Sequence, residues 1–278
     1  MKVLKKKSEL FNWKKTINKK TIGFVPTMGA LHLGHLSLIQ EAKNECDLVV
    51  VSIFVNKLQF GPKEDFKQYP RTLEQDIKLL KQGRVDVLFL PDHDEIYPCN
   101  LSLQINELNI STKLEGASRP GFFSGVLMIV LKLFNLVKPN FVYFGEKDIQ
   151  QLYIIKKMIE DLDFQITIRP CPTIRESSGL AISSRNQYLS EHEKKDASIL
   201  YKTLKKGKEL IKKNKKIDYI KQQMKELVTN KNIVIDYLSI ANLENFEEAE
   251  NSTVRPVVIS GAIYYKDVRL IDNLIVKK

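Results

Sequence analysis

The sequence predicts an α/β protein in which a doubly wound parallel sheet is followed by a smaller α+β domain. From residue 21 to about residue 168, short continuous apolar runs alternate with amphipathic stretches, a pattern typical of buried parallel strands joined by helices. After about residue 175 a Lys-rich helical region precedes three further apolar runs. A chain of 278 residues favours two domains over one, and we place them at 1–175 and 176–278.

Each element follows from the local hydrophobic pattern. Short, uninterrupted apolar runs predict strands at residues 22–26, 48–55, 85–90, 141–144 and 164–168. Helical periodicity predicts helices at residues 36–45, 68–81, 123–137 and 149–161. In the C-terminal part we expect helical structure at 191–230 and strands at 234–240, 257–264 and 268–276, the last two forming a hairpin around Tyr265-Lys266-Asp267.

Charge and composition restrict the class of protein. Apolar residues make up 43% and charged residues 28% of the chain, as in ordinary globular proteins. The formal net charge of +11 suggests a polyanionic partner, but residues 1–20 contribute +7 and residues 194–231 contribute +9, which leaves the rest at −5. We therefore interpret the basic runs as solvated surface and expect neither nucleic acid nor a membrane as partner.

The cysteines and the apolar runs indicate the compartment. Cys46, Cys99 and Cys171 are scattered, odd in number and without C-x-x-C spacing, so we expect no disulfide framework and no structural zinc site. No run approaches the ~18 apolar residues that a membrane span needs. Residues 1–15 contain no long apolar stretch, so we expect them not to be a secretory signal. We expect a cytoplasmic protein.

The sharpest local motif is P-T-M-G-A-L-H-L-G-H, at residues 26–35, between a predicted strand and a predicted helix. Its proline and glycines indicate a tight turn, and a helix that begins near His35 directs its positive end and backbone N–H groups at this turn. His32 and His35 are three residues apart, so both imidazoles can donate to one phosphate. A metal pair and two incidental surface histidines are the alternatives, and the strand-turn-helix setting favours an anion site.

Two further segments carry cationic or hydroxyl donors. Ser183, Ser184 and Arg185 lie in I-R-E-S-S-G-L-A-I-S-S-R-N, residues 174–186, where they either hold phosphate oxygens or form a capped turn. F-G-E-K-D-I-Q-Q-L, residues 144–152, follows an apolar strand, and open α/β sheets bind ligands at that end of a strand. Lys147 there is either a phosphate ligand or a solvated lysine beside helix-capping acids.

A fourth segment follows the second strand and carries neutral amides. Asn56 and Gln59 lie in I-F-V-N-K-L-Q-F-G-P, residues 53–62. Buried amides without partners are unfavourable, so we expect them to meet backbone groups or a ligand. Gln151 stands one helical turn after Lys147 and suits a hydroxylated substrate.

Together these motifs, in this order, resemble the pantoate–β-alanine ligase family of H-x-G-H nucleotidylyltransferases. The resemblance covers Gly23 to Asp272-Asn273 and also includes Y-P-R-T, F-x-G-V and K-L-F-N. It implies a Rossmann-like fold of the nucleotidylyltransferase type, ATP as co-substrate with Mg²⁺, pantoate and β-alanine as substrates, an enzyme-bound pantoyl adenylate, and a homodimer. It gives no protein ligands for the metal.

The resemblance also implies roles for residues of this chain. His35 would be the catalytic histidine and His32 its phosphate-binding companion, with Lys147 and Arg185 stabilising phosphoryl charge. Gln59 and Gln151 would hold pantoate, Gln59 would also lie near β-alanine, and Asn56 joins them as a substrate-binding residue. The ATP-binding residues would be Met28, Gly29, Ala30, Leu31, His32, Leu33, Gly34, His35, Gly145, Glu146, Lys147, Asp148, Ile174, Ile182, Ser183, Ser184 and Arg185.

Four positions depart from the family pattern, and two other functions compete. Lys57 replaces a proline, Phe122 a histidine, Ser178 an aspartate and Ile182 a methionine, which makes β-alanine affinity and loop positioning harder to predict than the reaction. The alternatives are another H-x-G-H nucleotidylyltransferase, such as phosphopantetheine adenylyltransferase, and a basic RNA-binding protein with a vestigial nucleotide site.

Overall fold

The computed structural model describes residues 1–62, 64–99 and 101–277. The chain forms two compact units. The predicted boundary near residue 175 lies close to Thr173, where the final segment of the second unit begins, but two short earlier segments also belong to that unit. The first unit contains Met1–Glu107, Arg119–Glu146 and Gln151–Pro172, and the second contains Leu108–Ser118, Lys147–Gln150 and Thr173–Lys278.

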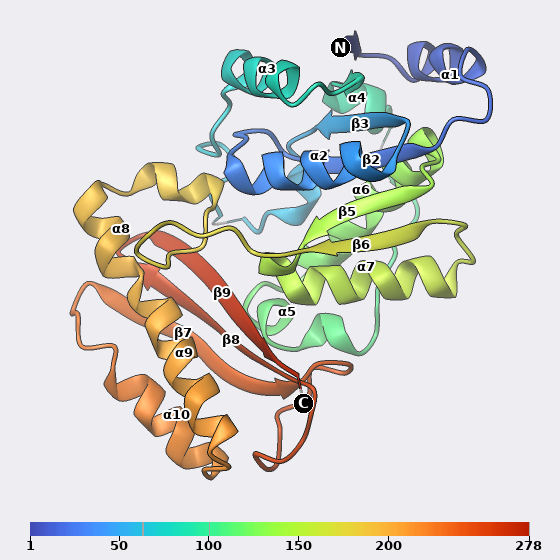
Figure 1. Cartoon of the computed structure of the whole chain (residues 1–278). Coiled ribbons are helices and arrows are strands. Elements are labelled where there is room, and N and C mark those ends of the chain that lie inside the picture. The colour runs from blue at the N-terminus through green and yellow to red at the C-terminus, as the bar shows by residue number, and fades with distance from the viewer. Residues whose placement is uncertain (63, 100, 278) are drawn as a thin grey trace. The chain divides into compact units, whose positions relative to one another are not determined.

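The first unit is built on a parallel sheet with the strand order β1-β4-β3-β2-β5-β6 (Figure 1). Its central strands are buried on both faces, which agrees with their uninterrupted apolar sequences. The doubly wound α/β class predicted from the sequence is therefore confirmed. The strands are β1 (Lys2–Leu4), β2 (Ile22–Thr27), β3 (Leu48–Ile53), β4 (Val87–Phe89), β5 (Phe141–Gly145) and β6 (Thr167–Cys171).

Helices cover both faces of this sheet. The strand order, together with the rule that such crossovers are right-handed, places α2 and α3 on one face and α6 and α7 on the other. Helix α2 buries Leu38, Ile39 and Ala42 against valines of the central strands. The helices are α1 (Lys7–Lys15), α2 (Leu33–Glu45), α3 (Leu73–Gln82), α4 (His93–Ile96), α6 (Phe122–Val137) and α7 (Ile149–Asp161), with the short 3₁₀ helices η1 (Lys57–Gln59) and η3 (Glu146–Asp148).

The strand order reverses between β2 and β5, which are neighbours in the sheet. From β2 the chain continues to β3 and β4 in one direction, whereas from β5 it continues to β6 in the other. Ligands of open α/β sheets bind outside the carboxyl ends of the strands at such a switch point. The histidine loop follows β2 and Gly145 ends β5, so the fold brings this loop and Gly145 to the same point of the sheet.

Several boundaries in the first unit differ from the predicted ones. Helix α3 begins at Leu73 instead of residue 68, because Pro70 has no N–H group and disfavours helical backbone at the preceding residue. Strand β6 runs through Pro170 rather than ending at residue 168, and proline is tolerated there because β6 is an edge strand. The basic residues 1–20 contain β1 and α1, which we do not predict from the sequence.

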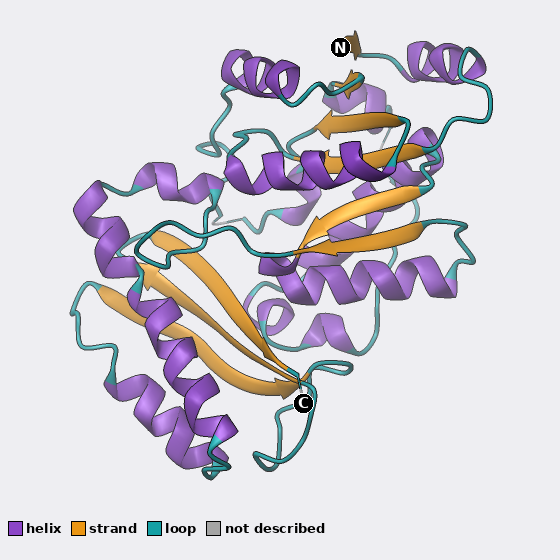
Figure 2. Cartoon of the chain, in the orientation of Figure 1, coloured by secondary structure: helices purple, strands orange, loops and turns teal. Residues whose placement is uncertain are grey.

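The second unit contains an antiparallel sheet with the order β7-β8-β9, and the predicted hairpin between β8 and β9 is confirmed. Helices α9 and α10 lie on one face of this sheet (Figures 1 and 2). The smaller α+β domain predicted from the sequence is thus present. The elements are α5 (Glu115–Ser118), α8 (Glu191–Ala197), α9 (Ile199–Lys212), α10 (Ile217–Glu226), β7 (Ile233–Asn242), β8 (Val257–Tyr265) and β9 (Val268–Val276), with η2 (Ile110–Thr112) and η4 (Ser184–Tyr188).

The Lys-rich region is helical, as predicted, and forms three helices. Ser198 separates α8 from α9, and a turn that includes Asn214, with φ of 50°, separates α9 from α10. Helix α9 buries Leu200, Leu204 and other apolar side chains in the core of the unit, while Lys202 is exposed. The basic charge of this region therefore occupies the solvated face of amphipathic helices. None of the helices in the described ranges is long and apolar enough to cross a membrane.

Candidate active site

The loop between β2 and α2 carries the two histidines side by side. His32 is the N-cap of α2, and its Nδ1 accepts a hydrogen bond from the Gly34 N–H at 3.2 Å. Nδ1 of His35 accepts from the His32 N–H at 3.3 Å, and the two ring centroids are 4.1 Å apart. Because each Nδ1 is an acceptor, the neutral form of each ring carries its proton on Nε2. Both rings can therefore donate from Nε2 to an anion, as their spacing predicts.

A buried carboxylate from α3 holds the backbone of this loop. The two carboxylate oxygens of Asp76 accept from the N–H of Ala30 at 3.0 Å and of Leu31 at 2.8 Å, and Asp76 is only 1% exposed. We expected the N–H groups of this loop to face a ligand, but these two donate to Asp76. Gly29 has φ of 81°, and a Cβ there would lie 3.1 Å from Asp76 Oδ2, so glycine suits both the backbone and the space.

Asp76 is a residue that our sequence reasoning missed, although the sequence contains a signal for it. It lies four residues before the buried Leu80, on the face of α3 that packs in the core. A carboxylate on a buried helix face is costly unless it is hydrogen-bonded. An acidic residue within an apolar stripe is therefore a reason to look for backbone donors nearby.

Asn56 and Gln59 form a hydrogen-bonded pair after β3. The Asn56 amide donates to Gln59 Oε1 at 3.1 Å and to the Gly125 carbonyl at 2.9 Å, and its oxygen accepts from the Tyr97 hydroxyl at 3.0 Å. Burial raises the pKa of Tyr97, so its hydroxyl remains a donor at neutral pH. These contacts suit Asn56 to orient Gln59, and the direct substrate contact that we expect for Asn56 stays a prediction.

Helix α6 approaches this pair through Gly125. A Cβ at Gly125 would lie 2.2 Å from the carbonyl oxygen of Leu58 and 2.6 Å from the backbone nitrogen of Gln59. These distances are shorter than any non-bonded contact allows, so a side chain there would displace the Leu58–Gln59 backbone. The glycine of the F-x-G-V motif is therefore required for steric reasons, because α6 packs closely against η1 at this position.

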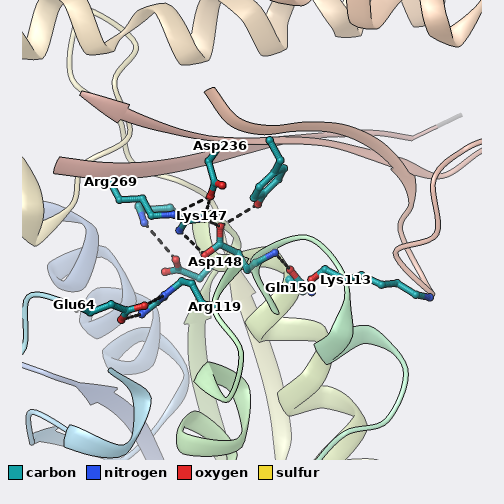
Figure 3. A network of polar contacts seen from close by, with 10 residues as sticks. Glu64, Lys113, Arg119, Lys147, Asp148, Gln150, Asp236 and Arg269 are labelled. Atoms are coloured by element: carbon teal, nitrogen blue, oxygen red, sulfur yellow. Dashed lines mark hydrogen bonds and ion pairs between the residues drawn. The ribbon is translucent and has the colours of Figure 1, made fainter. Parts of the chain in front are cut away.

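Arg119 contacts Phe122, which is one of the four positions that differ from the family pattern, and it also contacts the loop that carries Glu64. Its guanidinium donates to both oxygens of Glu64 at 2.7 and 2.6 Å (Figure 3). It also donates to the Gln59 carbonyl at 3.3 Å. It also lies over the ring of Phe122, 3.7 Å from the centroid. A phenyl ring at this position attracts the guanidinium through its π face. The phenylalanine thus makes a favourable contact with Arg119 where the family has histidine.

Lys147 and Gln151 stand on either side of the start of α7. The Nζ of Lys147 is 3.3 Å from Asp148 Oδ1 (Figure 3), and only 18% of the Lys147 side chain is exposed. The side chain of Lys147 is therefore mostly buried and pairs with Asp148, and its role as a phosphate ligand stays a prediction. Gln151 lies in the first turn of α7 and is partly exposed, beside the buried Gln150.

The segment from Ile174 to Asn186 folds as a short hairpin followed by η4. Ile182 donates its N–H to the Ile174 carbonyl at 3.0 Å, and Arg175 bridges to Ala181. Ser178 stands where the family has aspartate. Its hydroxyl accepts a hydrogen bond from the Leu180 N–H at 3.3 Å, so a side-chain hydrogen bond is present in this turn. Ser183 caps η4 by accepting from the Arg185 N–H at 3.3 Å. The capped turn that we considered for S-S-R-N is therefore present, and it is compatible with a role in phosphate binding.

No protein ligand set for a metal ion is evident in the described parts of the chain. Residues 1–62, 64–99 and 101–277 contain no group of three or more His, Cys, Asp or Glu side chains arranged to hold one.

Comparison with known proteins gives one consistent family. The family model for pantoate-beta-alanine ligase matches residues 2–275. The pantothenate synthetase of Thermosipho africanus is 48% identical over 99% of this chain and 100% of its own length. Among solved structures, the pantothenate synthetase of Thermus thermophilus superposes with a TM-score of 0.95 at 40% identity, with both chains fully covered. The pantoate-beta-alanine ligase of Francisella tularensis, complexed with beta-gamma ATP and beta-alanine, gives a TM-score of 0.82 at 38% identity and covers 99% and 97% of the two chains.

Proposed function

The chain belongs to the pantoate–β-alanine ligase family, and on this basis we propose that it condenses pantoate with β-alanine to give pantothenate, AMP and pyrophosphate. The observation that carries this function is a family match over residues 2–275, a range that includes all of the motifs described above. The chain is a ligase of pantothenate biosynthesis that uses ATP.

We propose that the first half-reaction forms pantoyl adenylate. A carboxylate oxygen of pantoate bonds to the α-phosphorus of ATP, the bond from that phosphorus to the bridging oxygen breaks, and pyrophosphate leaves with the electron pair. The attacking carboxylate is already anionic, so this step needs no general base. It needs donors for the charge on the phosphoryl oxygens. We assign that role to His32, His35, Lys147, Ser183, Ser184 and Arg185, while Gln59 and Gln151 hold pantoate.

In the second half-reaction the neutral amine of β-alanine attacks the acyl carbonyl carbon. The bond from that carbon to the phosphate oxygen breaks and AMP leaves, while the attacking nitrogen gives up one proton to solvent and becomes the amide nitrogen. AMP is a good leaving group, so the main requirement is to place the amine against the carbonyl. Gln59 is the residue that we propose for this placement, with Asn56 holding its side-chain amide.

Mg²⁺ is proposed as a companion of ATP rather than as a resident ion of the protein. The described residues offer no cluster of carboxylates and imidazoles for it, and Mg²⁺ is commonly bound through substrate phosphates and water. It would neutralise charge on the triphosphate, and we assign no step to it. A homodimer and a cytoplasmic location also remain proposals, which rest on the family resemblance and on the scattered cysteines.

Product analysis tests this function. Incubation of the purified protein with ATP, pantoate and β-alanine is expected to give pantothenate and AMP in equal amounts by mass spectrometry. Formation of ADP, or pyrophosphate release that requires phosphopantetheine instead of pantoate, would contradict it. The phosphopantetheine and RNA-binding alternatives are not favoured, because full-length matches to pantothenate synthetases account for both units.

Replacing Asp76 by asparagine tests how far the histidine loop depends on its hydrogen bonds to the Asp76 carboxylate. One oxygen would become an NH₂ group facing a backbone N–H, so a buried donor loses its acceptor, at a cost of about 1–3 kcal/mol in unfolding free energy. Because the loop carries His32 and His35, kcat/KM for ATP is expected to fall by about 10²-fold. Steady-state pyrophosphate release and chemical denaturation measure the two effects. Unchanged kinetics in a destabilised variant would show that the loop does not need Asp76.

Replacing Gln151 by alanine tests the pantoate assignment. We expect the KM for pantoate to rise by about tenfold, which corresponds to the loss of one or two hydrogen bonds, while the KM for ATP changes by less than about twofold. Glu160→Ala, on an exposed part of the same helix, is the matched control. An unchanged pantoate KM in the Gln151→Ala protein would remove Gln151 from the substrate site.

A further inference from the structure

Strand β9 carries two adjacent buried polar residues in an otherwise largely apolar strand. Asp272 is 4% exposed and Asn273 is 6% exposed. The family resemblance includes Asp272 and Asn273, but neither residue has a role in the mechanism proposed above. Buried polar side chains need hydrogen-bond partners, so the partners of these two residues indicate what the pair does.

Asp272 anchors the hairpin between Ile174 and Ile182. Its two oxygens accept from the Arg175 guanidinium at 2.6 and 2.8 Å. Arg175 also donates to the Gly179 carbonyl at 3.1 Å and lies over the ring of Tyr201 in α9, 4.0 Å from the centroid. The base of the hairpin and its turn are therefore tied to β9 by one guanidinium. This hairpin leads directly into Ser183, Ser184 and Arg185.

Asn273 anchors a different segment from the opposite face of the sheet. Its side-chain amide donates to the backbone carbonyl of Lys147 at 2.8 Å. Side chains of consecutive strand residues point to opposite faces. Asp272 pairs in register with Gly261, where an added Cβ would meet Leu200 of α9, so Asp272 is on the face that α9 covers and Asn273 is on the other.

The turn that Asn273 holds has a second, independent support. The Gln150 side chain donates to the carbonyls of Ile110 and Lys113 at 2.8 Å each and accepts from the Glu115 N–H at 3.1 Å. Glu115 in turn pairs with Arg269, which also contacts Asp236 (Figure 3). Loss of the Asn273 contact should therefore loosen Lys147 without unfolding the turn.

We infer that Asp272 and Asn273 are positioning residues for ATP, which set the Lys147 turn and the Ile174–Ile182 hairpin at a fixed separation from two sides of one strand. This rests on the proposed function, which assigns Lys147 and Ser183–Arg185 to the phosphates. Adjacent Cα atoms of a trans chain are about 3.8 Å apart, so the two anchors cannot drift relative to each other. Donors for a transferring phosphoryl group must be held to within about 0.5 Å.

Direct ATP binding and kinetics of Asn273→Ala test this inference, with Ser260→Ala as control. Ser260 is the register partner of Asn273 on the same face, and its buried hydroxyl has no partner among the described residues. We expect Asn273→Ala to bind ATP about 5- to 10-fold more weakly by calorimetry, which corresponds to one lost hydrogen bond. Its pantoate KM should stay within about twofold of the wild-type value, and Ser260→Ala should match the wild type in both.

A second arm separates positioning from general stability. In a Lys147→Met background the Asn273→Ala change should have little further effect on ATP binding, because the residue acts through Lys147. Unchanged ATP affinity in Asn273→Ala, or a parallel loss of ATP and pantoate binding with a lowered Tm, would overturn the inference. If the wild type binds ATP but makes no pantothenate, the proposed function fails while the calorimetric comparison still decides the role of Asn273.

Discussion

The His35→Ala protein is expected to release pyrophosphate from ATP and pantoate about 10²- to 10³-fold more slowly than the wild type, the usual consequence of removing one preorganised donor from developing charge. Nδ1 of His35 accepts from the His32 N–H, so the ring presents Nε2–H as the donor. Alanine removes that donor, and it also removes the acceptor of the His32 N–H at the start of α2. Single-turnover measurement of pyrophosphate release, with β-alanine omitted, isolates this step.

A matched substitution separates this effect from a change in stability. His192 is 84% exposed on α8, and His192→Ala is expected to behave like the wild type. The His35→Ala protein should unfold within a few degrees of the wild-type Tm, because His35 is only partly buried. Near-normal pyrophosphate release by a folded His35→Ala protein would remove His35 from the catalytic site.

Gly125→Ala is expected to have the largest effect on stability. The new methyl group would lie 2.2 Å from the Leu58 carbonyl oxygen, and such overlap is relieved only by moving backbone. We expect the free energy of unfolding to fall by about 3 kcal/mol or more. Because the displaced segment carries Gln59, any protein that folds should also have a pantoate KM raised by more than about tenfold. Denaturant unfolding and steady-state kinetics give the two values.

Gly61→Ala is the control for this prediction. A Cβ at Gly61 would make only ordinary contacts with the Glu64 side chain, at 3.6 Å or more, so its stability and pantoate KM should stay close to the wild-type values. A Gly125→Ala protein with wild-type stability would mean that α6 and η1 separate easily, and the close approach would then have no role in holding Gln59.

Much of the fold could be predicted because its strands and helices have clear periodicity. The continuous apolar run before Pro26 and the one before Gly145 predict buried parallel strands, and β2 and β5 are such strands. The spacing of His32 and His35 likewise predicts rings on one side of the loop. These features depend on residues within one or two turns of each other, which a sequence pattern records directly.

Features that depend on distant residues could not be predicted in the same way. Asp76 meets the histidine loop 45 and 46 residues away, and Asn273 meets Lys147 126 residues away. Periodicity does not report which backbone group will lie beside a buried carboxylate or amide. Residues 147–150 belong to the second unit, while Gly145 belongs to the first. This division could not be predicted either, because residues 147–150 make their contacts with β9 and with residues 108–118.

The most direct test of the central claim follows an oxygen atom through the reaction. Pantoate labelled with ¹⁸O in both carboxylate oxygens is incubated with the protein, ATP and β-alanine, and the AMP is analysed by mass spectrometry. If the carboxylate attacks the α-phosphorus, one ¹⁸O remains on phosphorus when the amide forms, so each AMP carries one label. Unlabelled AMP, or label in inorganic phosphate with ADP as the nucleotide product, would contradict an adenylate intermediate.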